Sequence, residues 1–255
     1  MSRPLLRGTA EVLAQVESAP RHEERFIVSE ELARLVMRTA GSHLQLTRDD
    51  RPYQWSTTVY CDTYDWQVYR AAEQGAALRL RFREYHRTRP EHAFGSARLW
   101  LELKEDVDDT SRKERFEIAG DLVPAFLRGE EILPPSTSGL SDRARALVRE
   151  GARPVVVTQY NRLAYAGIQD RIRVTADHNL IYLAIPWTRN DDEAIPSRIG
   201  PILAREIDVV IEMKWFDDLP SWAAELHGYL RQRAPEERPS KFVVGMRHLL
   251  GATPP

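Results

Sequence analysis

Residues 78–85, with the sequence LRLRFREY, alternate apolar and charged side chains with a period of two. This period predicts a β-strand, because successive side chains of a strand point to opposite faces. The apolar residues would share one face, and Arg79, Arg81 and Arg83 would share the other. Three guanidinium groups in a row repel one another unless an anion lies opposite them. The segment therefore indicates both a sheet and a polyanionic ligand.

Seven further segments are predicted to be strands, and several of them repeat the division into an apolar and a charged face. The predicted strands are 22–28, 54–62, 78–85, 97–105, 112–118, 155–166, 171–183 and 205–215. The predicted helices are 29–39, 62–73, 122–150 (interrupted by a loop at 133–140), 220–233 and 240–250, and 186–200 is predicted to be a polar loop. The charged faces of the other strands include Glu23, Arg25, Glu102, Lys104, Lys113, Arg115, Tyr160, Arg162, Arg173, Glu212 and Lys214.

Two arrangements of such strands are physically reasonable. A flat antiparallel sheet would leave its charged face in water and pack its apolar face on helices. A closed sheet would turn the charged face inward, and helices at 29–39, 122–150 and 220–233 would cover the apolar outside. The long charged residues on neighbouring strands favour the closed form. We therefore predict an α+β protein with an antiparallel eight-stranded β-barrel and outer helices, formed by residues 21–250 after an N-terminal extension of residues 1–20.

Composition sets limits on the class of protein. The chain has 255 residues, with 36 basic and 38 acidic side chains and a net charge of −2, which excludes a simple polybasic nucleic-acid binder. The single cysteine, Cys61, excludes an intrachain disulfide framework and a multi-cysteine metal site, and it suits a reducing compartment. No apolar run approaches the ~20 residues that span a bilayer. We expect a cytoplasmic protein, or one held at a membrane only through partners.

The predicted lumen suits a chain of phosphates. Arginine and lysine hold phosphate oxygens by charge-assisted hydrogen bonds. Carboxylates would hold Mg²⁺ or Mn²⁺ bridging those phosphates, because hard cations prefer oxygen ligands. Cys61 is expected to be a core thiol rather than a nucleophile. The tryptophans are expected to pack in the core or at the rim, although one of them could hold an adenine.

With these residues in view, the chain resembles the VTC domain, the polyphosphate-polymerase domain of vacuolar transporter chaperone complexes. That domain belongs to the CYTH-like superfamily of triphosphate tunnel metalloenzymes, and the resemblance covers about residues 20–250. The matching elements are RHEERF at 21–26, LRLRFREY at 78–85, LELK at 101–104, RKERF at 112–116, YNR at 160–162, RVTAD at 173–177, IEMK at 211–214 and SKF at 240–242. Each element is short, and the specificity lies in their order and strand placement.

The resemblance implies an eight-stranded tunnel that binds nucleoside triphosphate and polyphosphate with a divalent metal, and it assigns roles to individual residues. The expected catalytic residues are Arg25, Arg79, Arg81, Lys104, Arg115 and Glu212. The expected substrate-binding residues are Arg83, Lys113, Tyr160, Arg162, Arg173, Lys214, Ser240 and Lys241, and the expected metal ligands are Glu212 and Glu23. The chain departs from the family at the first strand, where the Glu-x-Lys pattern reads Glu23-Glu24-Arg25. Arginine keeps the charge but does not readily donate a proton.

The expected function is transfer of the γ-phosphoryl group of ATP to phosphate or to a growing polyphosphate chain. Two alternatives stay open. The same tunnel with a metal-activated water would be a triphosphatase acting on inorganic triphosphate or a nucleotide, and without turnover it would be a polyphosphate-binding sensor. The motifs fit an adenylate cyclase of the superfamily less well. The resemblance is compatible with a membrane-protein partner, and the sequence gives no indication of oligomeric state.

Overall fold

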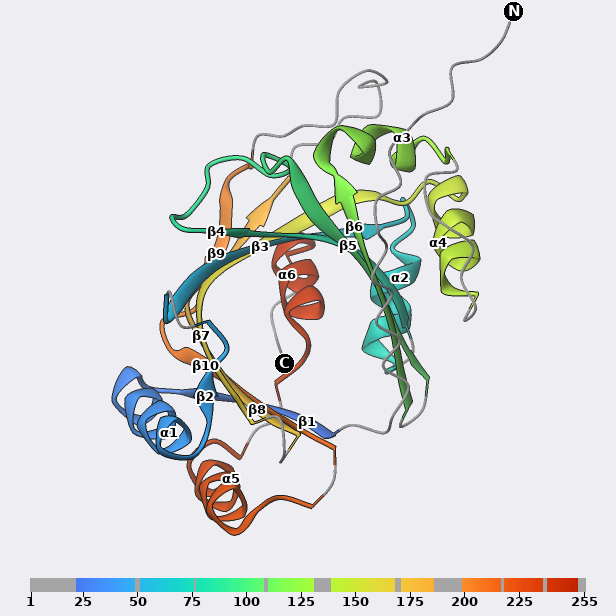
Figure 1. The fold of residues 1–255 in the computed structure, drawn as a ribbon. Helices are drawn as coiled ribbons and strands as arrows, with labels where there is room; N and C mark the ends of the chain where they lie inside the picture. The colour runs from blue at the N-terminus through green and yellow to red at the C-terminus, as the bar shows by residue number, and fades with distance from the viewer. Residues whose placement is uncertain are drawn as a thin grey trace, which may run out of the picture.

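A computed structural model describes residues 22–48, 51–75, 77–107, 110–130, 139–167, 171–185, 199–216, 218–235 and 238–251. Within these ranges an antiparallel sheet combines with α-helices on both of its sides (Figure 1). The strands are β1 (His22–Val28), β2 (Gln45–Leu46), β3 (Tyr53–Asp62), β4 (Ala77–His86), β5 (Arg98–Val107), β6 (Thr110–Ala119), β7 (Arg153–Gly167), β8 (Ile172–Ala184), β9 (Ile202–Arg205) and β10 (Val209–Trp215). The helices are α1 (Glu30–His43), α2 (Gln67–Glu73), the 3₁₀ turn η1 (Gly120–Leu122), α3 (Val123–Leu127), α4 (Leu140–Arg149), α5 (Ser221–Arg233) and α6 (Lys241–Leu249).

The main sheet runs in the order β1-β10-β8-β7-β3-β4-β5-β6, with β2 added to β7 and β9 added to β8. The antiparallel α+β prediction is confirmed. The prediction of a closed eight-stranded barrel is not, because in the described residues β1 and β6 are the two ends of the strand order and do not pair. Arg79 and Lys104 on one wall face Glu23 and Arg25 on the other. Such long side chains keep the two walls farther apart than the ~4.8 Å of a hydrogen-bonded strand pair.

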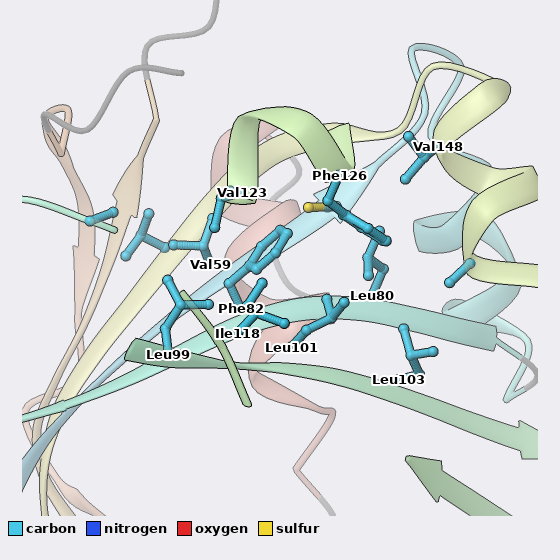
Figure 2. Close-up of a cluster of buried hydrophobic side chains, with 14 of the residues drawn as sticks. Val59, Leu80, Phe82, Leu99, Leu101, Leu103, Ile118, Val123, Phe126 and Val148 are labelled. Carbon is cyan, nitrogen blue, oxygen red and sulfur yellow. The ribbon is translucent and has the colours of Figure 1, made fainter. Parts of the chain in front are cut away.

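Apolar residues on the convex side of the sheet form two cores, each covered by helices. Across β3 to β6, residues such as Leu80 and Phe82 pack against Phe126 of α3 and Val148 of α4 (Figure 2). Across β1, β8 and β10, the outward residues pack against α1 and α5. The predicted covering helices therefore lie where the closed-sheet arrangement requires them. Outside the region covered by α6, these strands bury apolar side chains outward and place charged side chains on the concave side.

Helix α6 lies on the concave side of the sheet, within its curve (Figure 1). Its residue Phe242 packs beside Tyr60 of β3, and Gly245 lies so close to β7 that an added Cβ would be 3.0 Å from Val156. Ser240 caps the helix by accepting a hydrogen bond from the Val243 N–H at 3.3 Å. The sheet therefore wraps around its own C-terminal helix.

One predicted strand is wrong in detail. Residues 205–215 form the end of β9 and all of β10, separated by 206–208. The Glu206 N–H donates to the Leu180 carbonyl at 2.8 Å, and the Glu206 carboxylate pairs with Arg238, which turns the chain out of the strand. Ile207, which lies within the predicted strand, is consequently 98% exposed.

Helix boundaries also differ from the predictions. Helix α2 begins at Gln67 rather than at 62, because Asp62 accepts hydrogen bonds from the Val68 and Tyr69 N–H groups at 2.9 and 3.0 Å. Helix α1 continues to His43. The expected 1–20 extension, most of the 133–140 loop and most of the 186–200 loop lie outside the described residues. Among the helices that are described, none is long and apolar enough to cross a membrane.

Candidate functional site

The charged faces of the strands meet around one cavity of about 720 Å³ on the concave side of the sheet. All of the predicted site residues line it, so the prediction that the charged face turns inward is confirmed. Its cationic lining residues are Arg25, Arg79, Arg81, Arg83, Lys104, Lys113, Arg115, Arg162, Arg171, Arg173, Lys214 and Lys241. Its two carboxylates are Glu23 and Glu212, and Tyr60, Tyr160, Gly167, Ile172, Phe216, Ser240 and Phe242 complete the wall. This excess of positive charge suits a polyanion.

Two smaller cavities adjoin the main one. A cavity of about 370 Å³ shares Arg83, Lys113, Arg115, Arg162 and Arg173 with it. A cavity of about 200 Å³ between α2 and α6 shares Arg79 and Ser240 with it. Because the lining residues are shared, the three cavities are neighbours on the concave side of the sheet, and we call them together the tunnel.

Glu102 of β5 is the buried acid of one tunnel wall, with 0% exposure. Four cations surround its carboxylate. The distances are 2.8 Å from Arg81 Nε, 3.5 Å from Arg83 Nη1, 3.3 Å from Arg115 Nε and 3.6 Å from Lys113 Nζ. Burial raises the pKa of Glu102, but these cations outweigh it and hold the pKa well below its usual range. Glu102 therefore stays ionised and fixes four predicted site residues in one geometry.

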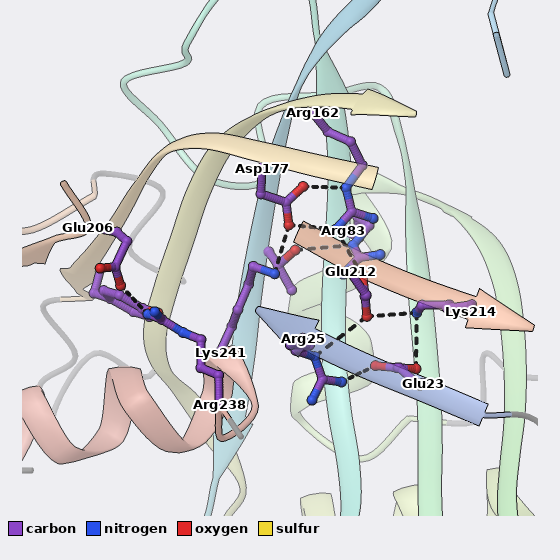
Figure 3. Close-up of polar contacts among 12 residues, drawn as sticks. Glu23, Arg25, Arg83, Arg162, Asp177, Glu206, Glu212, Lys214, Arg238 and Lys241 are labelled. Atoms are coloured by element: carbon purple, nitrogen blue, oxygen red, sulfur yellow. Dashed lines mark hydrogen bonds and ion pairs between the residues drawn. The ribbon is translucent and has the colours of Figure 1, made fainter. Parts of the chain in front are cut away.

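Asp177 of β8 is the buried acid that holds cations on the opposite wall, and it also has 0% exposure. It accepts two hydrogen bonds from Arg162, at 2.5 and 2.7 Å, and pairs with Lys241 Nζ at 2.7 Å (Figure 3). Burial acts to raise its pKa, but Arg162 and Lys241 hold it at about 2. A strand and the start of helix α6 are thereby joined through one carboxylate.

Glu23 and Glu212 lie side by side at the end of the sheet formed by β1 and β10. Both contact Lys214 Nζ, at 3.1 and 2.9 Å, and Arg25 pairs with both (Figure 3). Arg162 reaches Glu212 from the other side at 3.4 Å. The described residues contain no group of three or more His, Cys, Asp or Glu side chains suited to a metal. The pair can still hold a hard cation, since Mg²⁺ is commonly bound by one or two carboxylates together with substrate phosphates and water.

Several tunnel cations have lowered pKa values, because they are buried among like charges. Burial lowers the pKa of Lys104 to about 6, and repulsion from Arg79 and Lys214 acts in the same direction against the attraction of Glu23. Burial likewise lowers the pKa of Lys113 to about 8 and that of Arg79 to about 10. A polyanion in the tunnel would stabilise the protonated forms. The ligand-free tunnel therefore carries less charge than its composition indicates.

Sequence reasoning missed several residues that shape the tunnel. Glu102 and Asp177 lie at inward positions of predicted strands, so the period-two pattern marked them, but it gave no reason to treat acids as supports for cations. Arg238 was missed entirely. It donates to the Tyr182 hydroxyl at 3.0 Å and pairs with Glu206, which anchors the segment leading into α6. Its only sequence signal was proximity to the SKF element.

The chain was compared with families of known proteins and with solved structures. The sequence model of the VTC domain family matches residues 20–250, and no curated protein matches the chain. Among solved structures, a candidate adenylate cyclase from Bacillus halodurans is 14% identical with a TM-score of 0.47, over 88% of this chain and 95% of that one. A Hippeastrum protein described as having a dominant triphosphatase activity is 15% identical with a TM-score of 0.45, over 91% and 97%. A Pyrococcus horikoshii protein is 11% identical with a TM-score of 0.42, over 88% and 96%.

Proposed function

Because this chain belongs to the VTC domain family, whose sequence model matches residues 20–250, we propose that it synthesises polyphosphate from ATP in a metal-dependent phosphoryl transfer. The acceptor is phosphate or the end of a growing polyphosphate chain, and ADP is released. The observation that carries the proposal is the tunnel itself, where twelve cationic side chains and two carboxylates line one cavity of about 720 Å³. A chain of phosphates with a divalent ion is a ligand that matches both charges.

Phosphoryl transfer requires mainly positioning and neutralisation of charge, and the side chains of the tunnel supply both. Arg79, Arg81, Arg162 and Arg173 would contact phosphate oxygens from three different strands, which holds donor and acceptor in line. Their supports are already in place, since Glu102 fixes Arg81 and Asp177 fixes Arg162. No covalent nucleophile is needed. Cys61 is 1% exposed in the outer core and burial raises the pKa of its thiol, as expected for a packing residue.

Glu23 and Glu212 are the residues that would hold the divalent ion. Their adjacency across β1 and β10 and their shared contact with Lys214 fit a site that phosphate oxygens and water complete. Mg²⁺ or Mn²⁺ bound there would neutralise charge that develops on the transferring group. Lys214 and Arg25 offset the repulsion between the two carboxylates by pairing with both.

Arg25 stands where the family has lysine, and its surroundings keep it a cation. Burial lowers its pKa, but Glu23 and Glu212 outweigh that effect and hold the pKa above its ordinary value. Arg25 is therefore suited to electrostatic stabilisation and not to donating a proton. This departure keeps triphosphate hydrolysis as the second candidate function, because it alters a group that pairs with both metal-binding carboxylates.

Incubation of the purified protein with ATP and Mn²⁺ tests the proposal. Long-chain polyphosphate together with ADP supports the polymerase. Phosphate release from ATP or tripolyphosphate without chain growth supports the triphosphatase. Tight binding of polyphosphate without turnover, with affinity unchanged in Glu212→Gln, would instead support a sensor. Glu212→Gln should abolish synthesis in the first case, because the ion loses its principal carboxylate.

A further inference from the structure

The cavity of about 370 Å³ differs chemically from the rest of the tunnel, and we call it the Trp100 chamber. It meets the main cavity at five shared cations, which are Arg83, Lys113, Arg115, Arg162 and Arg173. Eight of the other ten wall residues are neutral, with hydroxyl, amide, aromatic or small apolar side chains, and the remaining two are Arg48 and Glu102. The ten residues are Thr47, Arg48, Pro52, Gln54, Ser56, Tyr85, Trp100, Glu102, Ala164 and Ala166.

Beyond the five shared cations a phosphate chain gains little, because it needs a cation opposite nearly every phosphate and this part of the wall adds Arg48 together with the acid Glu102. A nucleoside needs what the wall provides, which is a flat surface for the base and neutral hydrogen-bonding groups for its edge and ribose. We propose that the Trp100 chamber binds the nucleoside of the triphosphate substrate. A volume of about 370 Å³ falls within the ~300–1,000 Å³ of small-molecule pockets.

Trp100 and Arg115 form the platform of the chamber. The Arg115 guanidinium lies 3.7 Å from the centre of the Trp100 ring, and it also donates to the Tyr85 hydroxyl at 3.1 Å. Glu102, whose carboxylate lies 3.3 Å from Arg115 Nε, fixes the position of the guanidinium. A guanidinium stacked on an indole presents an extended flat surface, and bases stack on both groups. On β3, Gln54 and Ser56 add an amide and a hydroxyl to the same chamber.

This placement sets the direction of the substrate in the tunnel. Arg25, Glu23, Glu212 and Lys214 do not line the chamber but do line the main cavity. Arg162 lines both and lies 3.4 Å from Glu212. With the base in the chamber, the α-phosphate meets the shared cations and the γ-phosphate points toward Glu23 and Glu212, where the divalent ion would bind.

The acceptor then reaches the γ-phosphate from the part of the main cavity outside the chamber, which Phe216 and Arg171 line, with the Arg171 guanidinium 4.2 Å from the centre of the phenyl ring. An oxygen of the acceptor phosphate forms a bond to the γ-phosphorus, while the bond from that phosphorus to the β,γ-bridging oxygen breaks. The electron pair of the broken bond stays on ADP. ADP leaves through the Trp100 chamber, and the lengthened chain remains in the main cavity.

The inference rests on the proposed function only in taking ATP as the substrate, and binding tests it without turnover. Calorimetric titration would compare a non-hydrolysable ATP analogue with inorganic tripolyphosphate, each with Mg²⁺. Trp100→Leu should weaken binding of the ATP analogue about tenfold, the loss of one stacking partner, and leave tripolyphosphate affinity within about twofold. Gln54→Ala, which leaves the Trp100–Arg115 pair intact, should weaken only the ATP analogue. Phe216→Ala is the matched aromatic control, because Phe216 lines the main cavity but not the chamber, and it should not discriminate between the two ligands.

The outcomes separate this inference from the proposed function. Equal effects of Trp100→Leu and Gln54→Ala on both ligands, or no effect on either, would overturn the nucleoside assignment. Selective loss of the ATP analogue in Phe216→Ala would place the base beside Phe216 in the main cavity and overturn the assignment. Retained tripolyphosphate binding shows that a variant is folded, and Gln54→Ala decides the matter if Trp100→Leu does not fold. Failure of the wild-type protein to bind either ligand would instead reject the proposed function.

Discussion

Glu102→Gln tests whether the tunnel cations are held in place by buried carboxylates. The change keeps the shape of the side chain and removes the negative charge that four cations share at 2.8 to 3.6 Å. Removing one partner of a buried ion pair costs about 3–5 kcal/mol. The four cations are 12 to 27% exposed into the tunnel, so solvent screens part of this repulsion and we expect about 2–3 kcal/mol. For a domain of this size that lowers Tm by roughly 4–12 °C.

The assay is thermal unfolding of both proteins with and without tripolyphosphate. A ligand at 100 times its Kd stabilises a protein by about 2.7 kcal/mol. The variant should gain more than the wild type, because tripolyphosphate replaces the missing negative charge. The difference in unfolding free energy between the wild type and Glu102→Gln should be complete above a pH of about 4.5, the ordinary pKa of glutamate. It should shrink as the pH falls through the lowered pKa of Glu102, because the carboxylate then loses its charge.

Glu117→Gln is the matched control on the neighbouring strand β6. Glu117 pairs with Arg98 at 3.1 Å, but the two side chains are 32% and 78% exposed, so its removal should cost less than about 1 kcal/mol. Equal stability of Glu102→Gln and wild type without anion would refute the reasoning. So would an equal stabilisation of both proteins by tripolyphosphate.

Three further predictions follow from the charges of the tunnel. Arg162→Ala should lower stability by about 2–3 kcal/mol, because it leaves buried Asp177 with Lys241 alone. Arg173→Ala should keep or raise stability while abolishing activity. Denaturant melts in which Arg173→Ala is less stable than Arg162→Ala would contradict this. The ligand-free protein should become more stable as the pH rises above about 6, because unfolded Lys104 binds a proton that the buried group releases. Urea melts at pH 6 and 9 should show a smaller rise in the free energy of unfolding for Lys104→Met than for the wild type. An equal rise in both proteins would contradict this role of Lys104. Arg238→Ala should raise KM more than it lowers kcat, since it loosens the segment before α6; Arg238→Lys should restore part of the loss.

Much of the site could be predicted because period-two alternation is a local property. Arg79, Arg81 and Arg83 point the same way in any regular strand, so the side of the sheet that carries charge could be read directly from the sequence. Strand β8 shows where this reasoning fails. Asp177 and Tyr182 both lie on the concave side although their numbers differ in parity, because Asn179 with φ of 53° and a register shift against β7 interrupt the alternation.

Other features depend on contacts between distant segments and have no local signal. Helix α6 has apolar residues that would suit either side of the sheet, and its concave position depends on Arg238, Glu206 and Lys241. The break between β9 and β10 depends on the same Glu206. The open edges of the sheet depend on the size of the side chains that face one another across the tunnel, which a strand pattern does not measure.

A crystal structure with a non-hydrolysable ATP analogue and Mn²⁺ tests the central claim most directly, that the inward charged faces form a single polyanion site. The account predicts phosphate oxygens within hydrogen-bond distance of Arg79, Arg162 and Arg173, with Mn²⁺ bound to Glu212. A tunnel without ligand, with the analogue bound elsewhere on the surface, would contradict it.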